Sequence, residues 1–186
     1  MSFFALQVRT GGEQRFVALA SRGLNQEEMS LFWPRRNLRI RRGGHWYDSV
    51  APIFPSYLFL QASEVMPAVY HLLRRTPGFI RFLPSNERVA PLDRADHDLL
   101  NHFLGFGEIV QKSMAYFDEN KRIRVVAGPL INLEGRIVKV DRRKGRARVR
   151  LALYEDSFEV DFSFEALAAA PAPSAPTQPA ASPTAE

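Results

Sequence analysis

PIFPSYLFL, residues 52–60, decides the fold of this chain. Large apolar side chains fill the odd positions of this stretch as well as the even ones, although a strand whose sheet is covered by helices on one side needs only one apolar face. The second face therefore needs a cover. One interpretation is an interior strand that this chain alone buries on both sides. The other is a protein-binding patch rich in Tyr and Phe, residue types that dominate interface hot spots.

The residues around this strand predict an α+β domain over residues 1–104. Apolar runs and alternation predict further strands at 3–9, 31–33, 38–42, 46–47 and 79–83. Apolar positions at helical spacing predict helices at 13–21, at 65–73 and from Asp93, which is the expected N-cap of the third. The expected order is β-α-β-β-α-β-α, with Gly43 and Gly44 at the tip of a hairpin.

The second half of the chain has a different pattern. Residues 105–114 show no clear period and contain glycine, so we expect a linker there. Residues 115–168 contain only short alternating runs, which predict a small all-β barrel. Residues 169–186 are rich in Pro and Ala and have no large apolar side chain, so we expect a disordered tail.

Composition limits the class of function. The 25 Lys and Arg exceed the 20 Asp and Glu, giving a net charge of +5 and a pI near 9.9, which favours nucleic acid as a partner. The absence of cysteine excludes disulfides and thiolate metal sites, and we expect a cytoplasmic location. No signal-peptide pattern and no uninterrupted run of 18 apolar residues occurs, so we expect neither export nor a membrane.

Basic residues gather in two places. Five arginines between residues 35 and 42 precede Trp46 and Tyr47, and arginine next to an aromatic ring suits unpaired bases and phosphates. The denser cluster surrounds an expected hairpin tip at residues 142–145, and its candidate RNA-binding residues are Lys139, Arg142, Arg143, Lys144, Arg146 and Arg148. Acidic residues follow Arg150, which indicates a directed face. The alternative for the first cluster is a solvated edge strand that discourages aggregation, which is the more common role of such a charge run.

Catalytic patterns are poor. His97 and His102 are five residues apart and belong to no H-E-x-x-H motif, and no phosphate-binding glycine motif occurs. The chain offers no nucleophile, base and orienting group that can be named together. We therefore expect no enzyme, no metal and no cofactor.

Three stretches together resemble a known family. PIFPSYLFL at 52–60 and TPGFIRFL at 76–83 resemble two strands of the NusG transcription elongation factors, and GPLINLEGRIVKVD at 128–141 is similar to a KOW motif. They occur in order and at the family's spacing, so the resemblance covers nearly everything from residue 3 to residue 167. It implies an N-terminal NGN domain followed by a KOW barrel.

The resemblance also implies partners. The NGN domain would bind the clamp helices of the large catalytic subunit of RNA polymerase and suppress pausing or termination, with the contact on Ile53, Phe54, Tyr57 and Phe59. Non-template DNA would lie near basic side chains, for which the candidates are Arg74, Arg75, Arg41 and Arg42. The KOW barrel would recruit a second partner. We expect the protein itself to be a monomer.

Two features resemble specialised paralogues such as RfaH and LoaP more than the housekeeping factor. Residues 8–13, VRTGGE, look like the V-x-T-G-x-E opening of LoaP-like proteins, and the basic KOW hairpin would suit an RNA hairpin. The stretch Tyr154-Glu155-Asp156 stands where the housekeeping factor has its Phe-Gly loop for Rho and the ribosome. The alternatives are a housekeeping factor that couples transcription to translation, and a ribosome-associated KOW protein that binds RNA only.

Overall fold

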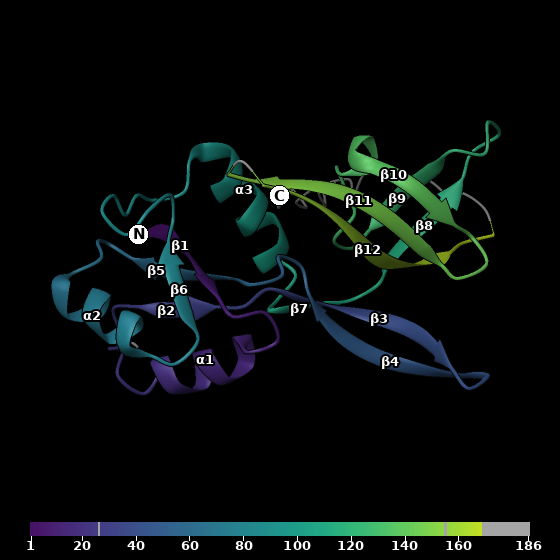
Figure 1. Cartoon of the computed structure of the whole chain (residues 1–186). Coiled ribbons are helices and arrows are strands. Elements are labelled where there is room, and N and C mark those ends of the chain that lie inside the picture. Colours follow the sequence, from purple (N-terminus) through teal and green to yellow (C-terminus); the bar gives the residue numbers. More distant parts are fainter. Residues whose placement is uncertain (26, 155, 169–186) are drawn as a thin grey trace, which may run out of the picture.

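The structure is a computed structural model that describes residues 1–25, 27–154 and 156–168 (Figure 1). The N-terminal part contains a four-stranded sheet in the order β2-β5-β1-β6. Its strands are β1 (Ser2–Val8), β2 (Ser30–Phe32), β5 (Tyr57–Ala62) and β6 (Phe79–Phe82). All neighbouring pairs are antiparallel, and β5 is an interior strand between β2 and β1. The predicted tail at 169–186 lies outside the described residues.

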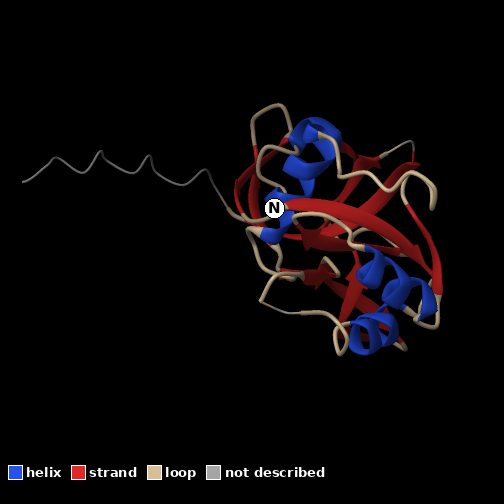
Figure 2. Cartoon of the chain, turned by 90° about the vertical axis from the view of Figure 1, so that its left-hand side faces the viewer, coloured by secondary structure: helices blue, strands red, loops and turns tan. Residues whose placement is uncertain are grey.

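Helices cover both faces of this sheet. α1 (Glu13–Ala20) and α2 (Pro67–Arg75) place Phe16 and Leu73 against the face that carries Leu58 and Leu60. α3 (Arg94–Leu104) packs on the opposite side, where it shares a core with Phe54 and Phe59. Its first turn is capped by Asp93, whose side chain accepts a hydrogen bond from the backbone N–H of Asp96 at 2.8 Å. The predicted N-cap is therefore confirmed. Figure 2, with helices in blue and strands in red, shows the helices lying around the strands.

The predicted hairpin extends away from this body (Figure 1). β3 (Arg35–Arg42) and β4 (His45–Pro52) pair antiparallel through the turn at Gly43 and Gly44, both of which have positive φ. A short strand, β7 (Ile109–Val110), adds to β3 in parallel, giving the order β4-β3-β7. β7 lies inside the segment expected to be a linker, so hydrogen bonds anchor part of that connection to the N-terminal domain.

The C-terminal part is all-β. Its elements are β8 (Ser113–Phe117), β9 (Ile123–Ala127), the 3₁₀ helix η1 (Glu134–Arg136), β10 (Ile137–Asp141), β11 (Arg146–Leu153) and β12 (Asp156–Ala166). The strands form one curved sheet in the order β10-β11-β12-β8-β9, in which only the pair of β12 and β8 is parallel. This half-barrel after an α+β domain confirms the predicted fold class.

One of the two hydrophobic clusters among the described residues spans both domains. It joins Phe54, just before β5, and Phe59 of β5 to Phe103 of α3 and to Val160 and Phe162 of β12. The rings of Phe103 and Phe162 stack with centroids 5.5 Å apart and planes 8° apart. The second apolar face of β5 is therefore covered within this chain, by α3 and the half-barrel, which is the first of the two interpretations of PIFPSYLFL.

A buried carboxylate fixes the turn that leads into β5. Glu13, at the start of α1, is 3% exposed, and its Oε1 accepts a hydrogen bond from the backbone N–H of Ser56 at 3.1 Å. Ser56 has φ of 71°, and its hydroxyl lies 2.6 Å from that of Thr10. The VRTGGE segment thus has a structural role here, because it holds the turn at the head of the apolar strand.

Gly145 positions the basic tip between β10 and β11. Its φ is +61°, and an added Cβ would lie 2.7 Å from the carbonyl oxygen of Phe164. Because both the left-handed backbone and the contact disfavour a side chain, Gly145→Ala is expected to destabilise the protein by about 1–3 kcal/mol. Gly135→Ala is the matched control, since a Cβ there meets nothing within 4 Å. Thermal unfolding of both variants measures the difference, and equal melting temperatures would contradict the strained geometry.

Candidate functional site

The four candidate polymerase-binding residues are all buried in this structure. Ile53 and Phe59 are 0% exposed, Phe54 is 1% and Tyr57 is 3%. Phe54 packs edge-on against Phe59, with ring centroids 5.6 Å apart, and against Phe103 of α3 at 6.1 Å. The four side chains are brought together, but at the border between the two domains and not at the surface.

Phe158 of β12 is the side chain that closes over this aromatic group. Its ring lies edge-to-face on Phe54, at 6.1 Å and 83°, and on Tyr57, at 5.6 Å and 82°. Phe158 remains partly exposed, which places this contact at the edge of the shared core. We call Phe54, Tyr57 and Phe158 the aromatic contact. The C-terminal domain occupies the surface that a partner of β5 would need.

A hydrogen bond adds to the aromatic contact. The phenol of Tyr57 donates to Oδ2 of Asp156, at the first residue of β12. Burial and this bond to a carboxylate raise the pKa of Tyr57 from 10.0 to about 12. Both effects favour the neutral phenol. The bond joins the two domains, so it forms only while they are in contact.

The raised pKa predicts how the domain contact responds to base. A folded-state pKa above the unfolded value means that the contact's contribution is complete below pH 10 and is lost as the pH rises through about 12. We expect the near-ultraviolet absorbance of ionised tyrosine to show one fewer late-titrating group in Tyr57→Phe than in the wild-type protein. Tyr154, whose pKa burial also raises to about 12, remains as an internal reference. A wild-type protein in which Tyr154 alone titrates late would contradict the assigned bond.

Further polar contacts cross the border, and the first involves the hairpin. Arg36 of β3 donates from Nε to the carbonyl oxygen of Asp161 at 2.6 Å, and its guanidinium lies 5.8 Å from the ring centroid of Phe162. Burial lowers the pKa of Arg36 to about 10, partly offset by the charge of Asp161.

Two more contacts come from α3. Asp96 accepts from the backbone N–H of Tyr154 at 2.9 Å, and His102 Nε2 donates to the carbonyl oxygen of Pro129 at 2.8 Å. Burial raises the pKa of Asp96. The two domains are therefore joined by directional bonds as well as by apolar burial.

Sequence reasoning missed the residues that make this border. Arg36 reads as one member of a basic run, and Phe158 and Phe162 read as ordinary alternation within a barrel strand. The available signal was the acidic segment after Arg150, which indicated a directed face. Asp156 and Asp161 of that segment do make contacts with the N-terminal domain.

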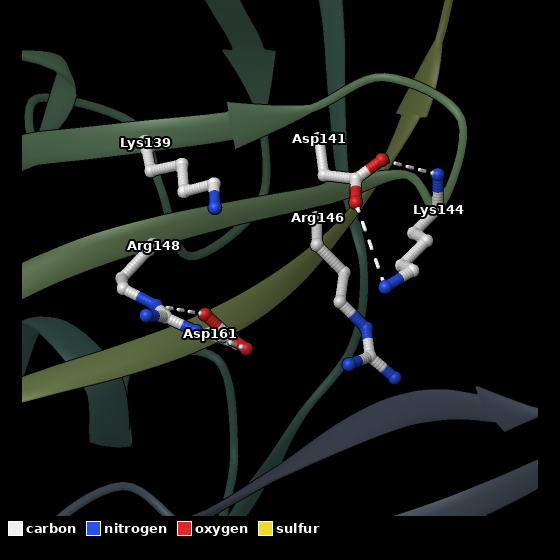
Figure 3. Close-up of a pocket in the computed structure, with 6 residues that line it drawn as sticks. All are labelled: Lys139, Asp141, Lys144, Arg146, Arg148 and Asp161. Carbon is white, nitrogen blue, oxygen red and sulfur yellow. Dashed lines mark hydrogen bonds and ion pairs between the residues drawn. The ribbon is translucent and has the colours of Figure 1, made fainter.

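The six candidate RNA-binding residues cluster on β10, β11 and the tip between them. Figure 3 shows four of them, Lys139, Lys144, Arg146 and Arg148, around a small pocket of about 160 Å³ that also holds Asp141 and Asp161. Arg148 is paired with Asp161 at 2.7 Å, which holds the pKa of that carboxyl below its usual range. Lys144 lies 3.8 Å from Asp141. The acids neutralise part of this pocket, and within the described residues Lys139 and Arg143 make no ion pair.

The four candidate DNA-binding residues fall into two separate places. Arg74 and Arg75 end α2, where Arg74 lies over the ring of Tyr70 at 5.4 Å. Arg41 and Arg42 end β3 near the hairpin tip, at the opposite end of the molecule (Figure 1). The structure does not bring these two pairs together. It brings Arg41 instead beside Arg143, Lys144 and Arg146 of the C-terminal domain.

The fold and its border define a class of protein: an α+β domain with a long basic hairpin, followed by a small half-barrel that packs on its aromatic strand. Residues 1–101 match the family described as "Transcription termination factor nusG". The chain belongs to the NusG family. Among the described residues, no helix is long and apolar enough to cross a membrane.

Curated relatives extend the match over both domains. The chain is 26% identical over 178 residues to the transcription termination/antitermination protein NusG of Thermus thermophilus, covering 88% of this chain and 96% of that one. It is 25% identical over 144 residues to the protein of the same name from Pseudomonas aeruginosa, covering 76% and 80%. A solved structure described as "Domain interaction in Thermotoga maritima NusG" matches with a TM-score of 0.58 at 15% identity, covering 87% of this chain and 93% of that one.

Proposed function

We propose that this chain is a transcription elongation and antitermination factor that binds the clamp helices of RNA polymerase through Phe54 and Tyr57 and contacts RNA through β10, β11 and their basic tip. The observation that carries the proposal is the aromatic contact. Two large rings of the N-terminal domain meet a third ring from a separate domain, which is the composition of a protein-binding hot spot. A barrel that only bound RNA would need no such surface.

In this proposal the half-barrel and polymerase compete for one surface. Phe158 and Asp156 occupy the ring and the hydroxyl of Tyr57, so the clamp helices reach Phe54 and Tyr57 only after β12 has moved away. The closed chain is then the resting form and the open chain is the form that binds. Ile53 and Phe59 support the surface from beneath, because neither is exposed at all.

Membership of the NusG family supports the transcriptional role, and the basic tip supports the RNA contact. Arg142, Arg143 and Lys144 are exposed at the turn between two strands, where the backbone N–H of Lys144 donates to Asp141 at 2.9 Å. The guanidinium of Arg142 lies over the ring of Phe117, 3.6 Å from its centroid, and donates to the carbonyl oxygen of Lys121. Cations in a fixed array lower the free energy of phosphate binding through counterion release.

A transcription assay with purified RNA polymerase tests the proposal. The full chain is expected to shorten pauses or increase read-through of a terminator, and the effect should depend on Tyr57. Polymerase that elongates identically with and without the chain, at concentrations where the two are shown to bind, would overturn the antitermination role. Polymerase that does not bind the chain at all, whether closed or opened, would leave the ribosome-associated alternative.

A further inference from the structure

A groove runs between the hairpin of the N-terminal domain and the basic tip of the C-terminal domain. One part, of about 1060 Å³, is lined by Arg39 and Trp46 on the hairpin and by Arg143 and Lys144 at the tip. A second part, of about 530 Å³, shares Trp46, Arg143 and Lys144 and adds Arg41 and Arg146. We call these two parts together the interdomain groove. Neither domain forms it alone.

The walls of the interdomain groove are strongly basic. Seven Lys or Arg side chains line its two parts, against two acids, Asp48 and Glu165. Glu165 is already paired with Lys112, and Lys144 lies 3.8 Å from Asp141, so five bases that form no ion pair with a described residue face a single remaining carboxylate, Asp48. Like charges on facing walls repel unless an anion lies between them. The chemistry therefore calls for a polyanion that follows the groove.

Trp46 narrows the choice of polyanion. Its side chain is 41% exposed, and the guanidinium of Arg39 lies 5.4 Å from its ring centroid. An exposed ring backed by a cation is a platform for the flat face of a base, and such faces are available only in unpaired strands. An acidic peptide or free phosphate would use the cations and leave the ring unused.

A bond across the groove ties its walls together. Arg146 of β11 donates from its guanidinium to the backbone carbonyl oxygen of Arg39 in β3. β12 also packs against β3 along the same border. The spacing of the two basic walls is consequently set by the closed arrangement of the domains.

From this geometry we infer that the interdomain groove binds single-stranded nucleic acid, with the phosphates between the two basic walls and a base stacked on Trp46. The inference deepens the RNA contact of the proposed function, since it adds the hairpin as a second wall and makes binding depend on domain closure. A strand that bridges both walls stabilises the closed chain by mass action. Nucleic acid bound in the groove then disfavours the open chain, in which Phe54 and Tyr57 are exposed.

Fluorescence anisotropy with a short labelled oligonucleotide tests the groove, using one mixed sequence as single-stranded RNA, as single-stranded DNA and as a duplex. The hairpin-wall variant is Arg39→Ala with Arg41→Ala, and the tip-wall variant is Arg143→Ala with Lys144→Ala. The control, Arg88→Ala with Arg94→Ala, removes the same charge from exposed positions outside the groove. Two further variants keep every basic side chain. Trp46→Leu removes the exposed ring, and Phe158→Ala is designed to separate the two walls of the groove. Tyr57→Phe is a milder opening variant, and circular dichroism confirms that each variant is folded.

Single strands are expected to bind more tightly than the duplex, with the RNA and DNA arms identifying the preferred backbone. Each wall variant should weaken binding about tenfold more than the control and flatten the salt dependence of log K by about 1.4, at about 0.7 for each phosphate that the variant no longer neutralises. Trp46→Leu should weaken binding about tenfold. Phe158→Ala, and to a smaller extent Tyr57→Phe, should weaken it although every basic side chain is kept.

The outcomes separate this inference from the proposed function. If only the tip-wall variant weakens binding, the interdomain groove is overturned and the RNA contact of the proposed function stands. If neither wall variant differs from the control, the groove and the RNA contact of the proposed function are both overturned. Tighter binding of the duplex, or equal displacement of the oligonucleotide by polyglutamate, would overturn the assignment to unpaired strands.

Discussion

Phe158→Ala is expected to raise the affinity of this chain for RNA polymerase by about tenfold or more. The substitution removes two edge-to-face contacts, with Phe54 and Tyr57, and each such pair contributes about 0.5–1.5 kcal/mol beyond its buried area. These contacts stabilise only the closed form, so their loss increases the fraction of open chain. Because the apparent affinity scales with the open fraction, destabilising closure increases binding without changing the binding surface.

Titration of labelled polymerase with the wild-type and variant chains measures this gain. Phe117→Ala is the control, since Phe117 packs on Phe164 inside the C-terminal domain and has no part in the aromatic contact. Amide spectra recorded by NMR should show the N-terminal and C-terminal signals of Phe158→Ala shifting together as the border opens. An affinity that stays at the wild-type value in a demonstrably open chain would mean that β12 does not cover the polymerase surface.

The second large expected effect is a loss of affinity for RNA polymerase. In the opened Phe158→Ala background, adding Tyr57→Ala should weaken polymerase binding by at least about 2 kcal/mol, or roughly thirtyfold, as expected for a central aromatic hot spot. The background is essential because Tyr57→Ala alone removes both the binding ring and the contact to Asp156, and the two effects on affinity oppose each other. Phe59 is unsuitable for this test, since it is fully buried and its truncation would leave a cavity.

Tyr47→Ala, placed in the same opened background, is the matched control for the loss. Tyr47 is 51% exposed on β4 and lies away from the aromatic contact. Polymerase binding is expected to be unaffected by this change. If the Tyr57 and Tyr47 variants bind polymerase equally well, the clamp-helix assignment fails and the tyrosine at position 57 serves only to close the chain.

Local sequence patterns predicted the individual elements well. Short-range signals predicted three features that the structure contains: the hairpin around Gly43 and Gly44, the cap at Asp93 and the interior position of β5. The apolar residues on both faces of β5 correctly indicated that something must cover the second face. Each of these signals depends on neighbours within one or two turns or on strict alternation.

The identity of the cover could not be predicted in the same way. Phe158 and Phe162 alternate along β12 as they would in a barrel that closes on itself, so their pattern is the same whether they face their own domain or Phe54 and Phe103. The burial of Arg36 is equally hidden, because its environment depends on a backbone carbonyl 125 residues away. Contacts between domains at such separations leave no periodic trace in a single sequence.

The strand β7 gives the closing domain a short tether. Since Ile109 and Val110 are paired with β3, only a few residues separate this anchored point from the start of β8 at Ser113. A short tether keeps an intramolecular ligand at an effective concentration on the order of millimolar. Dilution of the protein therefore does not open the chain. Under the proposed function, RNA polymerase at a lower concentration has to bind the surface of Phe54 and Tyr57 more tightly than the attached half-barrel does. Under that proposal, the polymerase affinity needed to open the chain depends on the length of the connection and not on the concentration of the factor.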